Sequence, residues 1–162
     1  MHRISEKNAL GIEKAIDAYG DMLFRVCLVM LINETDAEDA VQDTFLKYIQ
    51  KAPEFANSEH EKAWLLKVAS NNCKNMLRTR KRESHLYVDN LNDATYDIEI
   101  DSVAEILMEI PEKFRLVLSL YYIENYRVNE IAQIIGKTPS AVKMRLQKGR
   151  KLFDEKYRKE FG

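Results

Sequence analysis

The stretch from Tyr126 to Phe153, YRVNEIAQIIGKTPSAVKMRLQKGRKLF, constrains the fold of this chain more than any other segment. Apolar residues recur there at the spacing of one helical face. Gly136 follows, and glycine readily adopts the left-handed conformation with which many helices end. Thr138 is placed to cap a second helix, and Pro139 fits its first turn, where a missing N–H costs nothing. The stretch therefore predicts a helix-turn-helix, whose second helix enters the major groove of DNA.

The second helix of this predicted motif is basic. Between Lys137 and Lys151 the sequence holds six basic residues and no acidic one, although the whole chain has 25 basic and 26 acidic residues. A basic helix face is often no more than a solvated face. The local concentration of positive charge in a nearly neutral chain favours DNA binding over that plainer interpretation.

The remaining composition indicates an almost wholly helical protein. With 162 residues, the chain suits one large domain or two small ones, and it contains only five glycines and three prolines. No uninterrupted apolar run approaches the roughly 18 residues needed to cross a bilayer. The N-terminal sequence MHRISEKNALGIEK is too polar for a signal peptide. We therefore expect a cytoplasmic protein without direct membrane insertion.

No constellation of residues indicates catalysis or metal binding. Cys27 and Cys73 lie in apolar helical patterns without a Cys or His at metal-ligand spacing, which predicts two reduced, partly buried thiols. His2, His60 and His85 are scattered along the chain. We expect no enzymatic activity, no catalytic residue, no metal and no cofactor.

Three helices are predicted in the first half of the chain, and their many apolar positions indicate a bundle. Their expected bounds are Asn8–Ile32, Asp36–Gln50 and Glu59–Arg82. Gly20 is expected to bend or divide the first helix, since glycine lowers helix stability. Capping boxes, in which a Ser or Thr pairs with a Glu three residues later, are predicted at Thr35 with Glu38 and at Ser58 with Glu61.

The second predicted helix is crowded with acids in its first half. Acidic side chains near a helix start complement the helix dipole, which is one explanation for them. Asp43 lies beyond the first turn, however, where that effect has faded. An acidic docking surface for a basic partner is the other interpretation. The acids are Glu34, Asp36, Glu38, Asp39 and Asp43.

The third predicted helix has the opposite charge. From Lys67 to Arg82 it holds six basic residues, no acid and several asparagines. Aromatic and amide side chains on a basic helix suit single-stranded nucleic acid, because bases stack on rings and amides read base edges. Trp64, taken alone, is equally well explained as an anchor in the core.

An acidic stretch separates the two basic parts of the chain. Nine acids and neither Lys nor Arg occur from Glu83 to Glu112. Residues 83–101 lack helical periodicity and predict a linker that docks part of the time on one of the domains. A short helix from Ser102 to Glu109, and another from Pro111 that stops at Asn125, complete a four-helix C-terminal domain. The predicted domains are therefore 1–82 and 102–162, joined by 83–101.

Three segments in this order resemble an extracytoplasmic-function (ECF) sigma factor of the sigma-70 family of bacterial transcription initiation factors. They are DAEDAVQDTFLKYIQ (36–50), KAWLLKVASNNCKNMLRTRKR (62–82) and residues 110–153, and the resemblance covers nearly the whole chain. It implies an all-α fold of two small helical domains, the C-terminal one containing the helix-turn-helix. It also implies a non-enzymatic factor that directs bacterial core RNA polymerase to promoters and is controlled by an anti-sigma factor.

The resemblance also assigns roles to residues of this chain. The polymerase partners would be the β′ coiled coil, for the second helix, and the β flap. The loop Lys51 to Ser58 would hold an extruded base of the minus-ten element. The core polymerase-binding residues would be Asp39, Gln42 and Asp43. The minus-ten DNA-binding residues would be Trp64, Asn71, Lys74, Asn75, Arg78, Arg80, Lys81 and Arg82. The minus-thirty-five DNA-binding residues would be Ser140, Lys143, Met144, Arg145, Lys148 and Arg150.

The sequence departs from the family pattern at DNA-facing positions. Asn75 stands where the family usually has aspartate, Cys73 is unusual in its helix, and Pro139 and Ser140 replace a commoner acidic-plus-glycine start. A promoter sequence therefore does not transfer from the family. One alternative is a stand-alone helix-turn-helix regulator that binds an operator as a dimer. Another is a helical adaptor or anti-sigma-type protein that acts by protein contacts alone.

Overall fold

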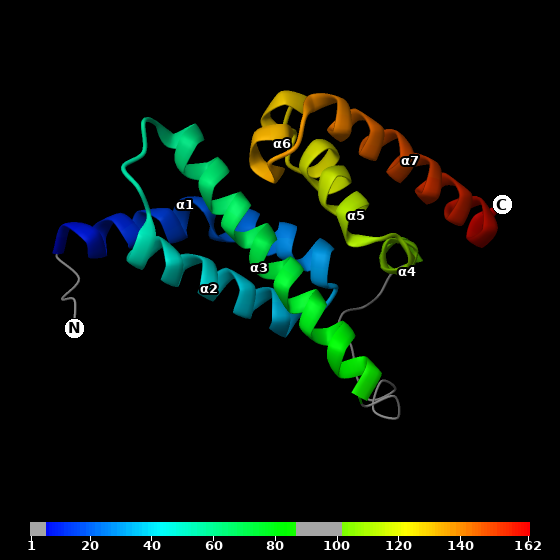
Figure 1. The fold of residues 1–162 in the computed structure, drawn as a ribbon, viewed down its shortest axis with the longest axis horizontal. Helices are drawn as coiled ribbons and strands as arrows, with labels where there is room; N and C mark the ends of the chain where they lie inside the picture. The colour runs from blue at the N-terminus through cyan, green and yellow to red at the C-terminus, as the bar shows by residue number, and fades with distance from the viewer. Residues whose placement is uncertain (1–5, 87–101) are drawn as a thin grey trace.

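The computed structural model describes residues 6–86 and 102–162 (Figure 1). The residues in these two ranges form helices and connecting turns without a strand, so the all-α prediction is confirmed. Residues 87–101 of the predicted linker lie outside the described residues. The helices are α1 Glu6–Leu31, α2 Glu34–Lys51, α3 Ser58–Leu86, α4 Ser102–Glu109, α5 Glu112–Leu118, the π-helix η2 Ser119–Ile123, α6 Val128–Ile135 and α7 Pro139–Phe161.

The bounds of the two long N-terminal helices differ from the prediction: α1 begins two residues earlier and ends one residue earlier than expected, and α3 is longer at both ends. α1 runs unbroken through Gly20, so that glycine does not divide it. The glycine costs about 1 kcal/mol relative to alanine, and the burial of Leu23, Val26 and Met30 on the same helix outweighs that cost. α3 continues to Leu86, four residues beyond its expected end at Arg82.

Both capping boxes predicted in the N-terminal half are wrong. α2 is capped by Asn33, whose side-chain oxygen accepts a 2.8 Å hydrogen bond from the Asp36 N–H. At the start of α3, the Asn57 side chain accepts a 2.8 Å hydrogen bond from the His60 N–H. Asparagine is at least as good a helix cap as serine or threonine. In both places an asparagine just upstream of the predicted cap therefore takes its role.

One hydrophobic core runs through both halves of the molecule. In the N-terminal half, α1, α2 and α3 pack around buried side chains such as Leu23 and Leu65. The same cluster continues through Leu116, Leu120 and Ile131 of the C-terminal half, α4 to α7. A smaller cluster of Ile106, Ile110 and Phe114 joins α4 to α5. Figure 1 shows α6 beside the middle of α3, with α7 extending away from it.

Gly149 allows α7 to approach α5 closely. It is buried, and a Cβ atom at this position would lie 3.2 Å from Leu118 Cδ1 and 3.4 Å from Phe114 Cβ. By contrast, the nearest atom to a Cβ at Gly20 would be Ile16 Cγ2 at 3.9 Å, an ordinary contact. Glycine is therefore required by packing in α7 but not in α1.

A matched pair of substitutions checks this difference. Gly149→Val is expected to lower the free energy of unfolding by about 1–3 kcal/mol, because the added methyl groups overpack the α5–α7 contact. Gly20→Ala is expected to raise it by about 1 kcal/mol, through helix propensity alone. Urea unfolding followed by circular dichroism measures both. Equal stability of Gly149→Val and the wild type would contradict the packing argument.

Candidate nucleic-acid and polymerase interfaces

The predicted helix-turn-helix is present, with the predicted turn chemistry. α6 ends at Gly136, which has a φ of 67° and so adopts the left-handed conformation. The Thr138 hydroxyl accepts a 3.1 Å hydrogen bond from the Ala141 N–H, and Pro139 is the first residue of α7. Asn125, with a φ of 60°, forms the left-handed stop before α6. Local sequence chemistry thus fixes the angle at which α7 leaves the turn.

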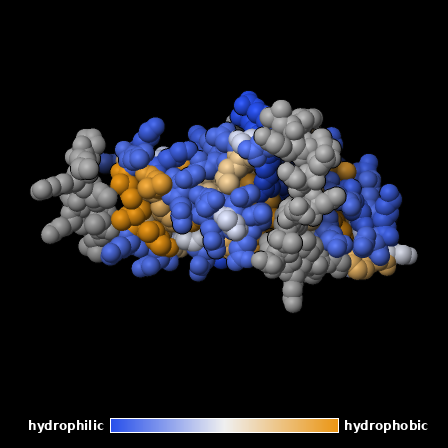
Figure 2. Space-filling view, turned by 90° about the horizontal axis from the view of Figure 1, so that it is seen from below, coloured by the Kyte–Doolittle hydropathy of each residue, from blue (hydrophilic) through white to orange (hydrophobic). Residues whose placement is uncertain are grey.

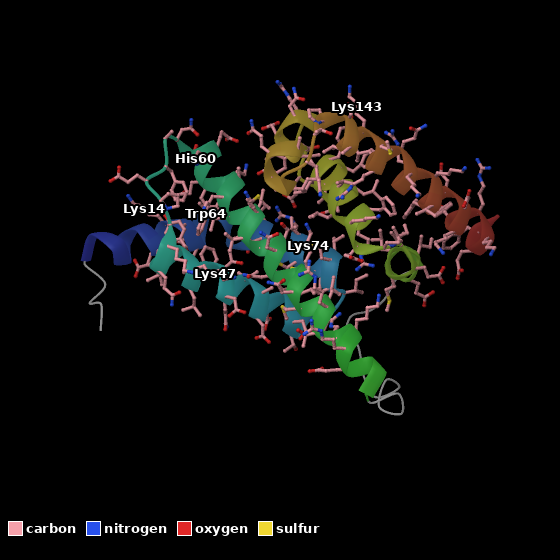
Figure 3. The ribbon with its side chains drawn as sticks, in the orientation of Figure 1. Lys14, Lys47, His60, Trp64, Lys74 and Lys143 are labelled. Carbon is pink, nitrogen blue, oxygen red and sulfur yellow. The ribbon has the colours of Figure 1, made fainter. Side chains whose placement is uncertain are left out.

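α7 presents a polar and basic stripe to the outside. Val142 and Leu146 are buried on the inner side of the helix. Ser140, Lys143 and Lys148 are exposed on the other side, together with Met144, whose exposed fraction is 68%. In Figure 3, Lys143 lies on the outer edge of the molecule, on the side away from α3. A helix of this kind, following a tight turn, has the shape and charge of one that lies in the major groove.

Two of the predicted minus-thirty-five residues also have neighbours within the protein. Arg145 is only half-exposed. Arg150 donates a 3.0 Å hydrogen bond to the Tyr122 hydroxyl of η2, and this contact raises the pKa of the guanidinium. Five of the six predicted residues, all but Arg145, are therefore exposed.

α3 carries a second stripe of polar and basic side chains. Asn71, Asn75 and Arg78 are exposed at intervals of three or four residues, so they follow one another along one side of the helix. Lys81 and Arg82 are exposed near its end. Leu65, Ala69 and Cys73 are buried on the opposite side. The amides and guanidinium on this stripe can donate to base edges and phosphates.

Trp64 belongs to an aromatic cluster at the start of α3. Its ring centroid lies 5.8 Å from that of Phe55, in the loop before α3, and 6.2 Å from that of Tyr48 on α2. His60 packs edge-on against Phe55 at 5.3 Å, and Figure 3 shows His60 and Trp64 side by side. Burial and a 2.9 Å hydrogen bond to Glu61 raise the pKa of Tyr48 to about 12. The half-buried Trp64 thus anchors the loop, which agrees with the packing interpretation.

Arg80 is turned away from the α3 stripe. Its guanidinium pairs with Asp36, with Nε 3.1 Å from Asp36 Oδ2, and Nη1 donates a 2.9 Å hydrogen bond to the Leu31 carbonyl. These contacts join α3 to the corner between α1 and α2. The structure therefore separates Arg80 from the exposed predicted minus-ten residues of α3 and gives Asp36 an ion-pair partner.

The predicted polymerase-docking residues share one face of α2. Asp39, Gln42 and Asp43 are all exposed. Leu46 and Ile49 continue this face one and two turns further on, with exposed fractions of 53% and 38%. Figure 2 shows a hydrophobic patch at the side of the molecule where α1 begins and α2 ends. The face is therefore acidic at one end and apolar at the other, and nothing in the described residues covers it.

Comparison with known proteins identifies both halves. The Sigma-70 region 2 family matches residues 15–83, and the Sigma-70 region 4 family matches residues 100–153. The chain belongs to the sigma-70 family. Among its relatives, the ECF RNA polymerase sigma factor SigW of Bacillus subtilis is 25% identical, over 88% of this chain and 87% of SigW. SigV of the same organism is 27% identical, over 85% of each chain.

Solved sigma factors have the same fold. The sigma factor RpoE of Bartonella quintana, in a crystal structure with the anti-sigma factor NepR, superposes with a TM-score of 0.74. The match covers 91% of this chain and 97% of RpoE, at 20% identity. CnrH, in complex with the cytosolic domain of CnrY, gives a TM-score of 0.69 at 24% identity over 91% of this chain and 88% of CnrH. The region 2 match accounts for α2 and α3, which a stand-alone helix-turn-helix regulator or an adaptor leaves unexplained.

The sigma factor has a polar network in its N-terminal core that the sequence did not predict. Asn72 is 6% exposed, and its side-chain amide donates a 3.1 Å hydrogen bond to the Thr44 hydroxyl of α2. Lys47 donates to the Asn72 carbonyl oxygen at 2.5 Å. Buried polar groups need such partners. Asn72 therefore fixes α3 against α2, whereas its neighbour Asn71 remains available at the surface.

Lys74 faces the C-terminal half of the sigma factor rather than open solvent. It is half-buried, and its pKa is lowered first by burial and then by Arg145, Lys137 and Arg78. Figure 3 places Lys74 on the middle of α3, on the side toward α5. A predicted minus-ten residue and a predicted minus-thirty-five residue therefore lie close enough to repel each other.

Among residues 6–86 and 102–162, no group of three or more His, Cys, Asp or Glu could hold a metal ion. No helix in these ranges is long and apolar enough to cross a membrane. Cys27 and Cys73 are both fully buried, and a hydrogen bond between the two thiols is the main cause of the raised pKa of Cys27.

Proposed function

We propose that this sigma factor uses three separate surfaces to direct a bacterial RNA polymerase to its promoters. The α2 face would bind the core enzyme, α3 and the loop before it would bind the minus-ten element, and α7 would bind the minus-thirty-five element. Residues 1–82 and 102–162 would form the two functional domains. The observation that carries the proposal is the presence of one acidic and two basic surfaces on the two regions that match the sigma-70 family.

Docking on the polymerase is assigned to the acidic end of the α2 face. Asp39, Gln42 and Asp43 are exposed, and among the described residues no ion pair neutralises either aspartate. Such charges guide association with a basic surface and exclude wrong partners. The exposed Leu46 and Ile49 would then add apolar contact area, whose burial is the dominant favourable term in most protein–protein association. The proposed partner surface is the β′ coiled coil.

Recognition of the minus-ten element is assigned to the α3 stripe and the loop 51–58. An opened strand offers unpaired bases, which stack on aromatic rings and bond to amides. Asn71 and Asn75 supply the amides, and Arg78, Lys81 and Arg82 supply positive charge for the backbone. Phe55 and Trp64 give the loop an aromatic floor against which an extruded base could be held.

Recognition of the minus-thirty-five element is assigned to α7. Ser140, Lys143 and Met144 lie in its first two turns, where recognition helices contact base edges. Lys148 lies further along the same stripe and would neutralise a phosphate. Arg145 and Arg150 would join them after leaving their present surroundings beside Lys74 and Tyr122.

The partners of similar sigma factors suggest how this one is controlled. RpoE and CnrH both have solved structures in complex with another protein, which for RpoE is the anti-sigma factor NepR. We propose that an anti-sigma factor likewise holds this chain away from the polymerase, in the cytoplasm where transcription takes place. Its role in initiation would be binding and positioning without a catalytic step of its own.

Reconstitution with the polymerase tests the proposed function. The purified protein is mixed with bacterial core RNA polymerase, and the mixture is analysed by size-exclusion chromatography and by transcription from a library of promoter sequences. We expect co-elution, and initiation from a small set of promoters that share minus-ten and minus-thirty-five elements. A well-folded protein that neither co-elutes nor supports initiation would overturn the proposal.

A substitution on α7 separates promoter recognition from polymerase binding. Lys143→Ala is expected to lower initiation at the preferred promoters about 10-fold, which is the typical cost of one base contact. The affinity for core polymerase should stay unchanged. Lys159→Ala, at an exposed basic position near the end of the same helix, is the matched control and should have little effect. If both variants support equal transcription, Lys143 is not part of the recognition surface.

A further inference from the structure

A pocket of about 420 Å³ lies between α5, η2 and α7, with one side chain each from α1 and α4 in its lining. Small-molecule sites in proteins have volumes of this order and are lined mainly by apolar side chains. The same is true here. The apolar side chains of the lining are Val29, Leu107, Leu118, Ile123 and Phe153. The pocket therefore has the size and the lining of a site for a small, largely apolar molecule.

Two polar atoms at this pocket are buried without a hydrogen-bond partner among the described residues. They are Nε of Arg115 and Oγ of Ser119, and both side chains belong to the lining. The two residues are 7% and 2% exposed. Such unpaired groups are uncommon in native proteins, because a buried donor without an acceptor is destabilising. The residues are four apart, so both donors lie on the same side of the helix and can serve one ligand.

Arg115 also carries a buried positive charge with which no carboxylate pairs in the described part of the chain. Its terminal nitrogens donate to the backbone carbonyls of Met30, Leu107 and Ile110, which are neutral. Burial lowers the pKa of the guanidinium, and the more distant carboxylate of Glu112 opposes this only in part. Buried charges in proteins are ordinarily paired. An anion at Nε would therefore satisfy both the last donor and the charge of this side chain.

The helix is irregular where it borders the pocket. Ser119 is the first residue of the π-helix η2, and its carbonyl accepts a 3.0 Å hydrogen bond from the N–H of Glu124, five residues later. A serine hydroxyl inside a helix can bond back to the carbonyl one turn earlier, but that of Ser119 does not. Single turns of π-helix are found frequently at functional sites. The irregular turn thus adds a sign of function that does not depend on the volume of the pocket.

Contacts outside the pocket hold its walls in place. Arg25 of α1 donates from Nε to Glu124 Oε1, at the end of η2, over 2.9 Å. Lys156 of α7 pairs with Glu109 of α4 at 2.9 Å. A pocket that is already formed binds its ligand without the cost of ordering its walls.

The rim of the pocket adds no net charge. Arg150 and Asp154 of α7 are exposed in the lining and four residues apart, so their opposite charges are neighbours on the helix surface. Arg150 also donates to the Tyr122 hydroxyl, which lines the pocket as well. The net positive charge of the lining therefore comes from the buried Arg115.

We propose that this pocket binds an amphipathic carboxylate, a small molecule with an ionised carboxyl group and an apolar tail. The carboxylate accepts hydrogen bonds from Arg115 Nε and from the Ser119 hydroxyl, and such charge-assisted bonds are the strong ones. The tail lies against Leu118, Ile123 and Phe153, and burial of its surface adds to the affinity. The inference concerns the sigma factor alone and does not depend on its proposed contacts with polymerase or DNA.

Titration calorimetry of the full chain with octanoate tests the site. We expect saturable binding of octanoate at a single site. 1-Octanol has the same tail without the charge, and acetate has the charge with almost no tail. Each should bind about tenfold or more weakly than octanoate, because each lacks one of the two kinds of contact.

Two substitutions place the ligand in the pocket. Ser119→Ala removes one hydrogen bond to a charged group and is expected to weaken octanoate binding about tenfold. It should not unfold the protein, because the hydroxyl has no partner to lose in the described residues. Val29→Phe puts a larger side chain into the pocket and should weaken octanoate binding by about tenfold or more. Ser70→Ala, at a serine of α3 that is 1% exposed, is the matched control and should leave the affinity unchanged.

Each outcome bears on a separate part of the proposal. Absence of saturable octanoate binding to the folded wild type overturns it. Equal affinities for octanoate and 1-octanol overturn the assignment of a carboxylate. If circular dichroism shows that Ser119→Ala and Val29→Phe are folded and both bind octanoate like the wild type, the pocket is not the site. Polymerase is absent from these titrations, so a failure of the proposed function would leave their results unchanged.

Discussion

The double substitution Asp39→Arg/Asp43→Arg on α2 is expected to weaken binding to core RNA polymerase about 100-fold or more. Each change reverses an exposed charge on the proposed docking face. Like charges brought together across an interface cost several kcal/mol, and each 1.4 kcal/mol is a factor of ten in affinity. Both side chains are exposed on the surface of α2, so the fold should remain intact. Fluorescence anisotropy of the labelled sigma factor, titrated with core polymerase, measures the loss.

A matched control distinguishes a specific face from a general charge effect. Glu13→Arg/Asp17→Arg reverses two exposed acids one turn apart on α1. Each Glu or Asp to Arg change adds two charges, so both double variants move from the formal net charge of −1 to +3. The α1 variant should keep nearly the affinity of the wild type. If the two variants lose binding equally, the α2 face is not the docking site.

Replacing Arg115 with methionine is expected to lower the free energy of unfolding by about 3–4 kcal/mol. Arg115 is 7% exposed, and it donates to the Ile110 carbonyl at 2.6 Å, to the Leu107 carbonyl at 3.3 Å and to the Met30 carbonyl. Methionine fills a similar volume but leaves these carbonyls without their donor. Hydrogen bonds to a charged group contribute about 1.5–3 kcal/mol each, although not additively. Urea unfolding measures the difference.

Two other substitutions sharpen the test at Arg115. Arg115→Lys keeps the charge but lacks the planar fork that reaches several carbonyls, so we expect about half the loss seen with methionine. Arg158→Met removes an exposed arginine from the last turn of α7 and should change stability by less than about 0.5 kcal/mol. A loss below about 1 kcal/mol in Arg115→Met would show that water replaces the guanidinium at these carbonyls.

Sequence reasoning succeeded where a residue's role depends on its immediate neighbours. Gly136, Thr138, Pro139 and Asn125 all occupy the predicted positions, because turn and cap conformations depend on a few adjacent residues. It failed at the N-terminal caps for a related reason. Two adequate capping residues stood close together in each place, and packing of the following helix selected the upstream asparagine.

The sequence alone did not predict the role of a residue whose partner lies far away along the chain. Arg80 belongs to a basic run, but its partner Asp36 lies 44 residues earlier in the chain. Asn72 and Asn71 are chemically identical neighbours, and only the position of Thr44 on α2 makes one of them a core residue. The Arg25–Glu124 pair spans 99 residues. The charge pattern predicted what kind of surface each helix carries, and the packing of α1 to α3 decided which residues remain on it.

Because both cysteines are buried, the rate at which they react with a thiol reagent measures the transient separation of α1 from α3. Cys27 and Cys73 are its only thiols, and each is fully buried where α1 packs against α3. An alkylating reagent can reach them only when these helices part, so the labelling rate reports the free energy of that opening. The rate should respond to substitutions in the N-terminal half. Separation of the two halves from each other, with α1 to α3 still packed together, should leave the thiols protected.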